Sequence, residues 1–316
     1  MIKRFAPGSK LSKGSSVIIE DPSRPAPSAS ANPASARVIV PGLHFVATPI
    51  GAARDITLRA LDILAGADIL AAEDTRTLKH LMEIHGVSLG NRHVYAYHEH
   101  NDDAMRPRLM QALAEGKSVA YASEAGTPLV SDPGFQLSRA AIEAGHAVLA
   151  APGASAMLCA LTVSGLPSDR FLFVGFPPAT KSARGRFLQD LAAVNATLIL
   201  YESPKRINQL LEDLSQYMGE KRYAAVCREL TKRFEEVTRG TLAELTAAFA
   251  GRAVKGEIVV LVDRVGEVKV EAGMVETALK VALATMTVKD AAAVVAEAYG
   301  LPRRDIYQRA LSMGTK

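Results

Sequence analysis

The stretch "SVAYASEAGTPLVSDPG" (residues 118–134) joins a short apolar run to a loop rich in glycine, proline and hydroxyl side chains. The first six residues have the length and apolar content of a buried strand. The loop after them can turn sharply and bring its main chain close to a bound molecule, because glycine accepts backbone angles that other residues avoid. A strand followed by such a loop, and then by a helical pattern at 135–145, is typical of α/β domains whose loops bind ligands.

The same succession of strand, loop and helix recurs along the chain. In the first half, apolar runs predict strands at 43–47, 67–72, 93–98, 118–123 and 146–150, and helical periodicity predicts helices at 57–66, 76–86, 102–115 and 135–145. In the second half, the predicted strands are 170–176, 196–201, 223–230 and 257–263, and the predicted helices are 183–193, 204–218 and 241–250. Several connections in the second half are short, which favours some antiparallel pairing there. The fold class is therefore α/β, with two α/β domains and a largely parallel sheet in the first.

The composition changes at both ends of the chain. Residues 21–38 are rich in proline, alanine and serine without periodicity, which predicts a disordered tail. After residue 264, three short helical patterns are broken at Thr287 and at 300–302, and they resemble a small helix-turn-helix unit. We therefore expect four parts: a disordered tail at 1–40, α/β domains at 41–154 and 155–268, and a helical module at 269–316.

Charge and cysteine content narrow the possible functions. The net charge of the 316-residue chain is +4, and residues 1–40 carry this whole excess, with six basic side chains and two acidic ones. The rest of the chain is neutral, which argues against a basic field over the whole surface.

The two cysteines, Cys159 and Cys227, are far apart in sequence and suggest neither a disulfide framework nor a zinc site, so we expect a cytoplasmic protein. The uncharged stretch 147–166 is interrupted by Pro152 and Gly153, which predicts a strand, a loop and a buried helix rather than a membrane span.

Three loops that follow predicted strands share the features of the opening stretch, at 47–57, 123–134 and 151–157. None of them has the three-glycine fingerprint of dinucleotide-binding folds, and the sequence has no Gly-Lys-Ser phosphate loop. Nucleoside triphosphates and nicotinamide cofactors are therefore disfavoured. One such loop alone is more often an ordinary tight turn, but three in succession favour a flat, amphipathic cofactor held by the main chain.

The motifs of this sequence resemble those of a known superfamily. The segments "HFVATPIGAARDITLRAL", "SEAGTPLVSDPG" and "PGASAML" resemble the cofactor loops of the tetrapyrrole-methylase-like superfamily, in an order that extends over residues 42–312. Four further motifs resemble the ribosomal RNA small subunit methyltransferase I family in particular, namely "EDTR" (73–76), "YHEHN" (97–101), "YESP" (201–204) and "RELTK" (228–232). One departure is Glu124, which stands where that family usually has aspartate.

This resemblance implies that S-adenosylmethionine (AdoMet) binds in a cleft between the two α/β domains. Carried over position by position, the expected cofactor contacts are Ile50, Ala125, Gly126, Thr127, Val130, Ser155, Ala156, Tyr201, Glu202 and Leu230. The implied reaction is methylation of a cytidine ribose 2′-hydroxyl in 16S rRNA, at the decoding centre of the small ribosomal subunit. The resemblance also implies a homodimer and a substrate that is either 16S rRNA or the small subunit.

Charged residues near these loops are candidates for catalysis and for RNA binding. The catalytic candidates are Glu73, Asp74 and Glu124, although Asp74 equally suits the cap of the helix that follows it. The RNA-binding candidates are Arg76, Lys205, Arg206, Arg228 and Lys232. Arg184 and Arg186 extend the cluster around Lys205, and such charge runs are also common on solvated faces. His98 and His100 have the spacing of metal ligands, but no third ligand of matching type follows, so no metal is expected.

Two alternative functions stay open from the sequence alone. A tetrapyrrole C-methyltransferase of the precorrin type would use the same cofactor loops, but it would leave the four RNA-type motifs without a role. A non-enzymatic nucleic-acid-binding regulator would use the terminal helices, whose 42 residues from 275 onward hold six basic and four acidic side chains. That alternative leaves the loop series unexplained.

Overall fold

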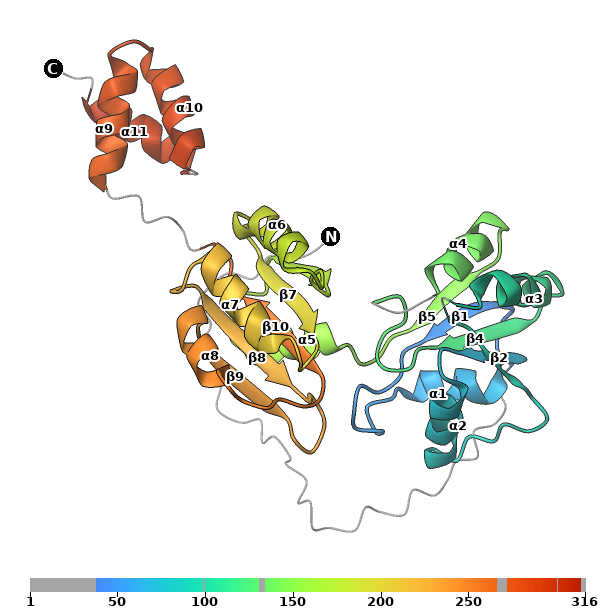
Figure 1. Ribbon diagram of the computed structural model, residues 1–316. Coiled ribbons are helices and arrows are strands. Elements are labelled where there is room, and N and C mark those ends of the chain that lie inside the picture. The colour runs from blue at the N-terminus through green and yellow to red at the C-terminus, as the bar shows by residue number, and fades with distance from the viewer. Residues whose placement is uncertain (1–37, 99, 131–133, 266–271, 300, 314–316) are drawn as a thin grey trace, which may run out of the picture.

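The computed structural model describes residues 38–98, 100–130, 134–265, 272–299 and 301–313. Most of the tail predicted at 1–40 lies outside these residues. Figure 1 shows two α/β domains side by side and a small helical module that lies apart from them. Among the described residues, no helix combines the length and the apolar character needed to cross a bilayer.

The first domain is built on a five-stranded sheet in which every pairing is parallel, with the order β3-β2-β4-β1-β5. Its strands are β1 (Gly42–Val46), β2 (Ile69–Ala72), β3 (Val94–Ala96), β4 (Ser118–Ala122) and β5 (Val148–Ala151). Its helices are α1 (Leu58–Gly66), α2 (Thr75–Ile84), α3 (Asp102–Ala114) and α4 (Phe135–Glu143). Each strand and helix of this domain overlaps an element predicted from the sequence.

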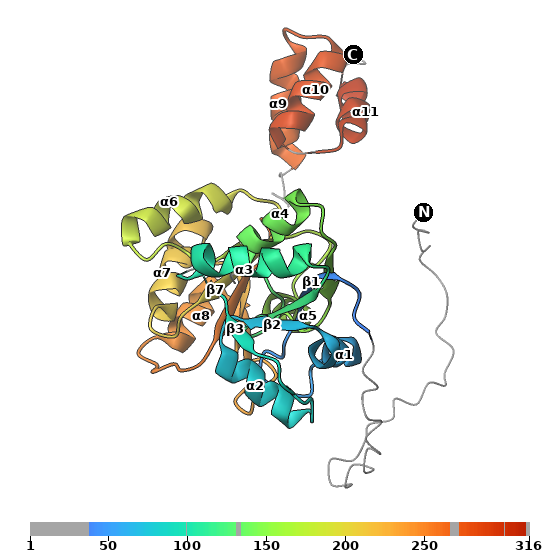
Figure 2. The same cartoon turned by 90° about the vertical axis from the view of Figure 1, so that its right-hand side faces the viewer.

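Helices cover both faces of this sheet, because successive strand residues point to opposite sides. On β1, Val46 packs with α1 and α2, whereas Leu43 and Phe45 pack with α3 and α4. Figure 2 shows the two helix pairs on opposite sides of the sheet. This double-sided burial explains why the strands are continuous apolar runs rather than alternating ones.

The second domain has a mixed sheet with the order β6-β7-β10-β8-β9. Only β6 and β7 are parallel, and the other three pairings are antiparallel, as the short connections predicted. Its strands are β6 (Phe171–Gly175), β7 (Thr197–Glu202), β8 (Tyr223–Arg228), β9 (Glu236–Thr241) and β10 (Ile258–Val262). Its helices are α6 (Lys181–Ala192), α7 (Ile207–Met218) and α8 (Leu242–Phe249), all on one face of the sheet. Strand β9 was missed because it is a polar edge strand without an apolar run.

The other face of the second sheet forms the contact with the first domain. Helix α5 (Ala156–Ser164) packs there against β8 and β10. Ile50, from the loop after β1, joins the same apolar cluster as Leu161 of α5 and Leu230 of the loop after β8. The two domains therefore share a core where their loops meet.

The C-terminal module consists of α9 (Ala272–Leu283), α10 (Val288–Tyr299) and α11 (Arg303–Met313). These three helices follow the three predicted patterns, and the breaks at Thr287 and 300–302 are confirmed. The module has a core of its own, formed by Val275, Leu279, Ala292, Val295, Ala296, Ile306 and Ala310.

Candidate active site

A cavity of about 710 Å³ lies between the two α/β domains. Loops after β1, β2, β4 and β5 line it from the first domain, and loops after β6, β7 and β8 line it from the second. Carboxyl ends of parallel strands gather at one edge of a sheet, which is where α/β proteins bind ligands. The three glycine- and proline-rich loops singled out from the sequence all contribute to this cavity.

The three loops of the first domain are tied together by their own hydrogen bonds. Gly126 and Thr48 exchange both main-chain hydrogen bonds, at 3.0 and 3.1 Å. The Thr127 hydroxyl donates to the carbonyl of Ala154 at 2.9 Å, so its proton is used within the protein. These contacts join the loops after β1, β4 and β5 into a single cradle.

Gly126 adopts a backbone that other residues rarely reach, as the sequence predicted. Its φ is +84°, and an added Cβ would come within 3.1 Å of Cγ2 of Ile50. A larger residue here would be strained and would also displace a side chain that lines the cavity. Gly126 therefore sets the shape of the cradle.

The structure places every predicted cofactor contact on the wall of this cavity. Among these residues, Ser155 has a hydroxyl that is suited to hydrogen-bond a ligand. It is the N-cap residue of α5, but its hydroxyl makes no capping bond and is buried without any hydrogen-bond partner among the described residues. A buried polar atom without a partner costs free energy, and a ligand in the cavity would supply that partner. The ten predicted contacts that line the wall are Ile50, Ala125, Gly126, Thr127, Val130, Ser155, Ala156, Tyr201, Glu202 and Leu230.

The lining of the cavity is acidic. Glu73, Glu124, Glu202 and Glu257 all contribute to it, and Lys232 is the one basic side chain among the described lining residues. Lys232 is itself held by two carboxylates, Glu229 at 3.1 Å and Glu257 at 2.9 Å. Such a wall attracts a cationic ligand and repels phosphate.

Two of the three catalytic candidates, Glu73 and Glu124, are neighbours on the cavity wall. The main-chain N–H of Glu124 donates to Oε2 of Glu73 at 3.3 Å. Burial raises the pKa of the Glu124 carboxyl, and the nearby charges of Glu73 and Asp74 raise it further. A carboxylate with a raised pKa is a better proton acceptor than one with the ordinary pKa.

The third catalytic candidate, Asp74, is used as a helix cap. Its carboxylate accepts the main-chain N–H groups of Arg76 at 2.7 Å and Thr77 at 3.3 Å at the start of α2. The Arg76 side chain also donates to it, at 2.8 Å, and these hydrogen bonds lower the pKa of Asp74 to about 2. Asp74 is not among the residues that line the cavity.

The RNA-binding candidates lie in contrasting surroundings. Arg206 donates to Glu202 at 3.0 Å and to the carbonyl of Pro177 at 2.6 Å, and Arg228 pairs with Glu236 at 3.0 Å. By contrast, the Arg76 side chain is exposed and Lys205 is an exposed residue with no ion pair among the described residues.

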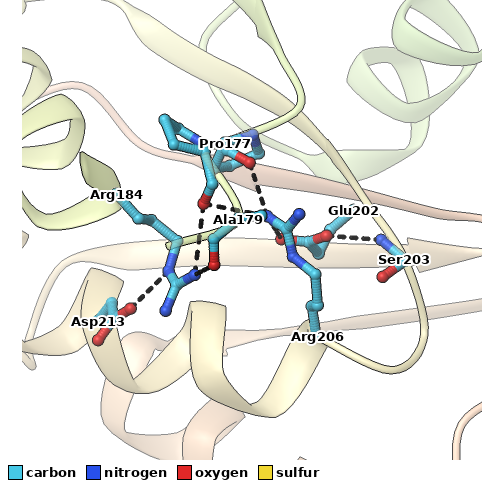
Figure 3. A network of polar contacts seen from close by, with 8 residues as sticks. Pro177, Ala179, Arg184, Glu202, Ser203, Arg206 and Asp213 are labelled. Carbon is cyan, nitrogen blue, oxygen red and sulfur yellow. Dashed lines mark hydrogen bonds and ion pairs between the residues drawn. The ribbon is translucent and has the colours of Figure 1, made fainter. Parts of the chain in front are cut away.

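One sequence interpretation is wrong. Arg184 was grouped with Lys205 as a cluster available to phosphate, but only 1% of Arg184 is exposed. Its Nε donates to Oδ2 of Asp213 at 2.6 Å, and its Nη1 donates to the carbonyl of Ala179 at 3.0 Å (Figure 3). A buried arginine must be paired in this way, because an isolated buried charge is very costly.

His98 and His100 lie near each other, with ring centroids 6.0 Å apart. Within the described ranges, no three histidine, cysteine, aspartate or glutamate residues are grouped so that they could hold a metal ion.

Sequence reasoning did not single out several of the lining residues, and Glu257 and Phe176 are two of them. Glu257 stands just before β10, whereas the prediction from the sequence rests on loops at the carboxyl ends of strands. Because β10 is antiparallel to β7 and β8, its amino end pairs with their carboxyl ends, where Ile258 faces both Glu202 and Arg228. The motif "KGEIVV" could have revealed this position if the pairing direction had been known. Phe176 could not be distinguished from a core residue by its type.

Comparison with solved structures shows the same fold in methyltransferases of tetrapyrrole synthesis. A cobalt precorrin-4 methyltransferase matches with a TM-score of 0.54 and 18% identity, over 70% of this chain and 94% of that chain. Diphthine synthase matches with a TM-score of 0.52 and 17% identity, over 70% of this chain and 89% of that one. The chain therefore shares its two-domain α/β fold with these proteins.

Sequence comparisons identify the family of this chain more closely than the fold does. The family model of Tetrapyrrole (Corrin/Porphyrin) Methylases matches residues 42–246, and that of the RsmI C-terminal HTH domain matches 270–314. Two proteins called ribosomal RNA small subunit methyltransferase I are similar along nearly their whole length. The one from Mesorhizobium japonicum is 46% identical over 88% of this chain and 94% of its own, and the one from Halalkalibacterium halodurans is 42% identical over 84% and 93%. The chain therefore belongs to the tetrapyrrole methylase family and, within it, to the ribosomal RNA small subunit methyltransferase I branch.

Proposed function

We propose that this protein transfers a methyl group from AdoMet to the 2′-hydroxyl of a cytidine in 16S rRNA, at the decoding centre of the small ribosomal subunit. One observation carries the proposal: 46% identity to a ribosomal RNA small subunit methyltransferase I extends over 88% of the chain, and the RsmI C-terminal HTH domain model matches the C-terminal module at 270–314. The solved tetrapyrrole methyltransferases share the fold at only 18–21% identity, which does not favour a tetrapyrrole as the acceptor.

The cavity has the features that AdoMet requires. When bound, AdoMet supplies an electrophilic methyl group on a positively charged sulfonium. The acidic wall suits that charge, the unpaired Ser155 hydroxyl offers a hydrogen bond, and the cradle around Gly126 brings main-chain groups to the cavity. We assign cofactor binding to the ten lining residues identified above.

Positioning of the acceptor is expected to contribute more than proton transfer. Orientation of two reactants can lower a barrier by roughly 7–11 kcal/mol. A general base typically contributes about 10²- to 10⁴-fold. We assign the base to Glu124, since its carboxyl is partly desolvated and lines the cavity. Glu73 is assigned a positioning role, because it holds the main-chain N–H of Glu124.

The acidic cavity cannot itself attract RNA phosphates, so docking needs cations elsewhere. Helix α11 of the C-terminal module presents Arg303, Arg304 and Arg309 as exposed side chains, and none of them has an ion pair among the described residues. We assign phosphate contacts to this helix, and also to the exposed Lys205 of the α/β domains. Arg76, Arg206, Arg228 and Lys232 stay weaker candidates because carboxylates already hold them, although the Arg76 side chain is 90% exposed.

A methyl-transfer assay tests this function. Tritium-labelled AdoMet is incubated with small subunits that lack the modification, with naked 16S rRNA and with a porphyrinogen. We expect label in RNA alone, and nuclease digestion followed by mass spectrometry should place it in 2′-O-methylcytidine. Label in the porphyrinogen, or on a base instead of a ribose, would overturn the proposal. We further infer a cytoplasmic homodimer, which light scattering of the purified protein would check.

A further inference from the structure

We propose that Phe176 is the platform on which the base of the acceptor nucleotide stacks while its ribose is methylated. This inference rests on the proposed function, and it names a residue that positions the RNA substrate inside the cavity.

Phe176 is an apolar ring that the fold leaves open to solvent at the cavity. It follows β6 and lines the cavity, yet 57% of the residue is exposed. Tyr201 packs against it in a T-shaped contact with ring centroids 5.6 Å apart, and Phe173 packs against Tyr201 at 4.8 Å. Phe176 is thus the outermost of three aromatic rings and keeps surface free for another ring.

Two arginines hold the backbone beside Phe176. Arg206 donates to the carbonyl of Pro177 at 2.6 Å, and Arg184 donates to that of Ala179 at 3.0 Å (Figure 3). Each arginine is anchored in turn by a buried carboxylate, Glu202 at 3.0 Å and Asp213 at 2.6 Å.

The chain that follows Phe176 is also stiff. Residues 177 and 178 are both proline, which fixes the φ angle of each. Four charged side chains and two prolines therefore fix a segment whose exposed ring has no partner beyond Tyr201 among the contacts of the described residues. A rigid ring loses little entropy when it binds, which is the property that a stacking platform needs.

The surroundings of Phe176 favour a nucleobase over other ligands. The acidic wall disfavours phosphate, whereas a base is a flat, uncharged ring. Sequence-specific RNA proteins bind unstacked bases on aromatic side chains, and enzymes that modify a nucleotide first draw it out of its stack. A base held on Phe176 would place its own ribose in the cavity that Glu73 and Glu124 line.

Three substitutions of Phe176 distinguish stacking on an aromatic ring from the effect of apolar side-chain volume alone. Phe176→Ala removes the ring, Phe176→Leu keeps an apolar side chain without a π face, and Phe176→Tyr keeps the ring. The matched control is Phe171→Ala, since Phe171 begins the same strand, is 40% exposed and is not among the residues lining the cavity. Each variant is assayed for kcat and KM with unmodified small subunits, for AdoMet affinity by calorimetry, and for thermal unfolding.

We expect Phe176→Ala to lower kcat/KM for the RNA substrate by roughly 5- to 150-fold, the loss typical of one base–aromatic stack. Phe176→Leu should lose nearly as much, and Phe176→Tyr should stay within about twofold of the wild type because it keeps the π face. AdoMet affinity and the melting temperature should not change in any of them. Phe171→Ala should match the wild type in every assay.

Two results would overturn the inference. If AdoMet affinity falls as much as kcat/KM, the ring belongs to the cofactor site. If Phe176→Ala or Phe176→Leu methylates RNA like the wild type, no base stacks there. Failure of the proposed function gives a different result, because then the wild-type protein itself transfers no label to RNA.

Discussion

Three arginines of the α/β domains lie in different surroundings from the arginines of the C-terminal module. In the α/β domains, Arg184, Arg206 and Arg228 are each held by a carboxylate at 2.6–3.0 Å. In the module, the arginines of α11 are exposed and have no ion pair among the described residues. An arginine that already has a carboxylate partner contributes to the fold, whereas an unpaired one is available to a phosphate.

Acidic residues show the complementary difference. Asp74 and Asp213 are each bonded to an arginine, whereas no ion pair holds Glu73 or Glu124 within the described part of the chain. The two glutamates lie on the cavity wall. We therefore expect the unpaired acids at the cavity to take part in methyl transfer. The paired charges should stabilise the fold, and the unpaired arginines of the module should bind RNA. Four variants and a pH profile test these assignments.

The largest effect is expected at the cavity. Glu124→Gln removes the proposed base and keeps the side-chain size, so kcat should fall by roughly 10²- to 10⁴-fold. Asp74→Asn is the matched control, because asparagine caps a helix as well as aspartate does. Single-turnover methylation measures both variants. Equal rates for Glu124→Gln and the wild type would remove Glu124 from the mechanism.

The rate should also depend on pH through Glu124. Only the deprotonated carboxylate accepts a proton, so the rate should fall as the pH drops through the pKa of Glu124. Partial burial and the nearby charges of Glu73 and Asp74 raise that pKa above the ordinary value of 4.5, so the loss should begin at a higher pH than for a glutamate with the ordinary pKa. The profile of the single-turnover rate against pH measures this, and the acidic loss should disappear in Glu124→Gln.

The next largest effect concerns stability. Arg184→Ala leaves Asp213 buried without its partner, and the free energy of unfolding should fall by about 3–5 kcal/mol. Arg264→Ala removes an exposed pair with Asp169, and this control should cost about 1 kcal/mol or less. Urea denaturation measures both. Similar losses for the two variants would contradict the structural role of Arg184.

A smaller effect is expected on RNA docking. The triple variant Arg303→Gln, Arg304→Gln and Arg309→Gln should raise KM for the small subunit while kcat and AdoMet affinity stay unchanged. The slope of log affinity against log salt should become shallower by about one for each arginine that contacts a phosphate. An unchanged slope would leave the module as a cap without a role in RNA binding.

The smallest effect is expected for a paired arginine. Arg228→Gln removes one of two arginines that hold Glu236, and Arg252 stays at 2.7 Å. RNA affinity and its salt slope should match those of the wild type in filter-binding assays. A slope shallower by about one would show that Arg228 contacts phosphate despite its partner, and the comparison would fail.

The sequence predicted most of the fold, because apolar runs and turn residues act locally. Strands β1 to β8 and β10 lie at or beside predicted positions, and the three terminal helices follow the predicted breaks. Strand β9 was missed because its residues are polar and its pairing with β8 depends on the tertiary structure.

The site was predictable only in part, for a related reason. The cofactor loops can be recognised in the sequence by their glycine and proline residues. Gly126 has the expected positive φ. The partner of a charged side chain is not a local property, since Arg184 and Asp213 are 29 residues apart. Glu257 reaches the cavity only because β10 is antiparallel to β7. Residues that reach the site through long-range pairing can therefore be identified only from the structure.

The central claim is that the cradle around Gly126 binds AdoMet. Calorimetric titration of the purified protein with S-adenosylhomocysteine, the product form of the cofactor, tests it most directly. We expect one binding site per chain in the wild type and none in Gly126→Val, since valine tolerates neither φ +84° nor the contact with Ile50. Equal binding by the two proteins, or no heat with the wild type, would contradict the claim.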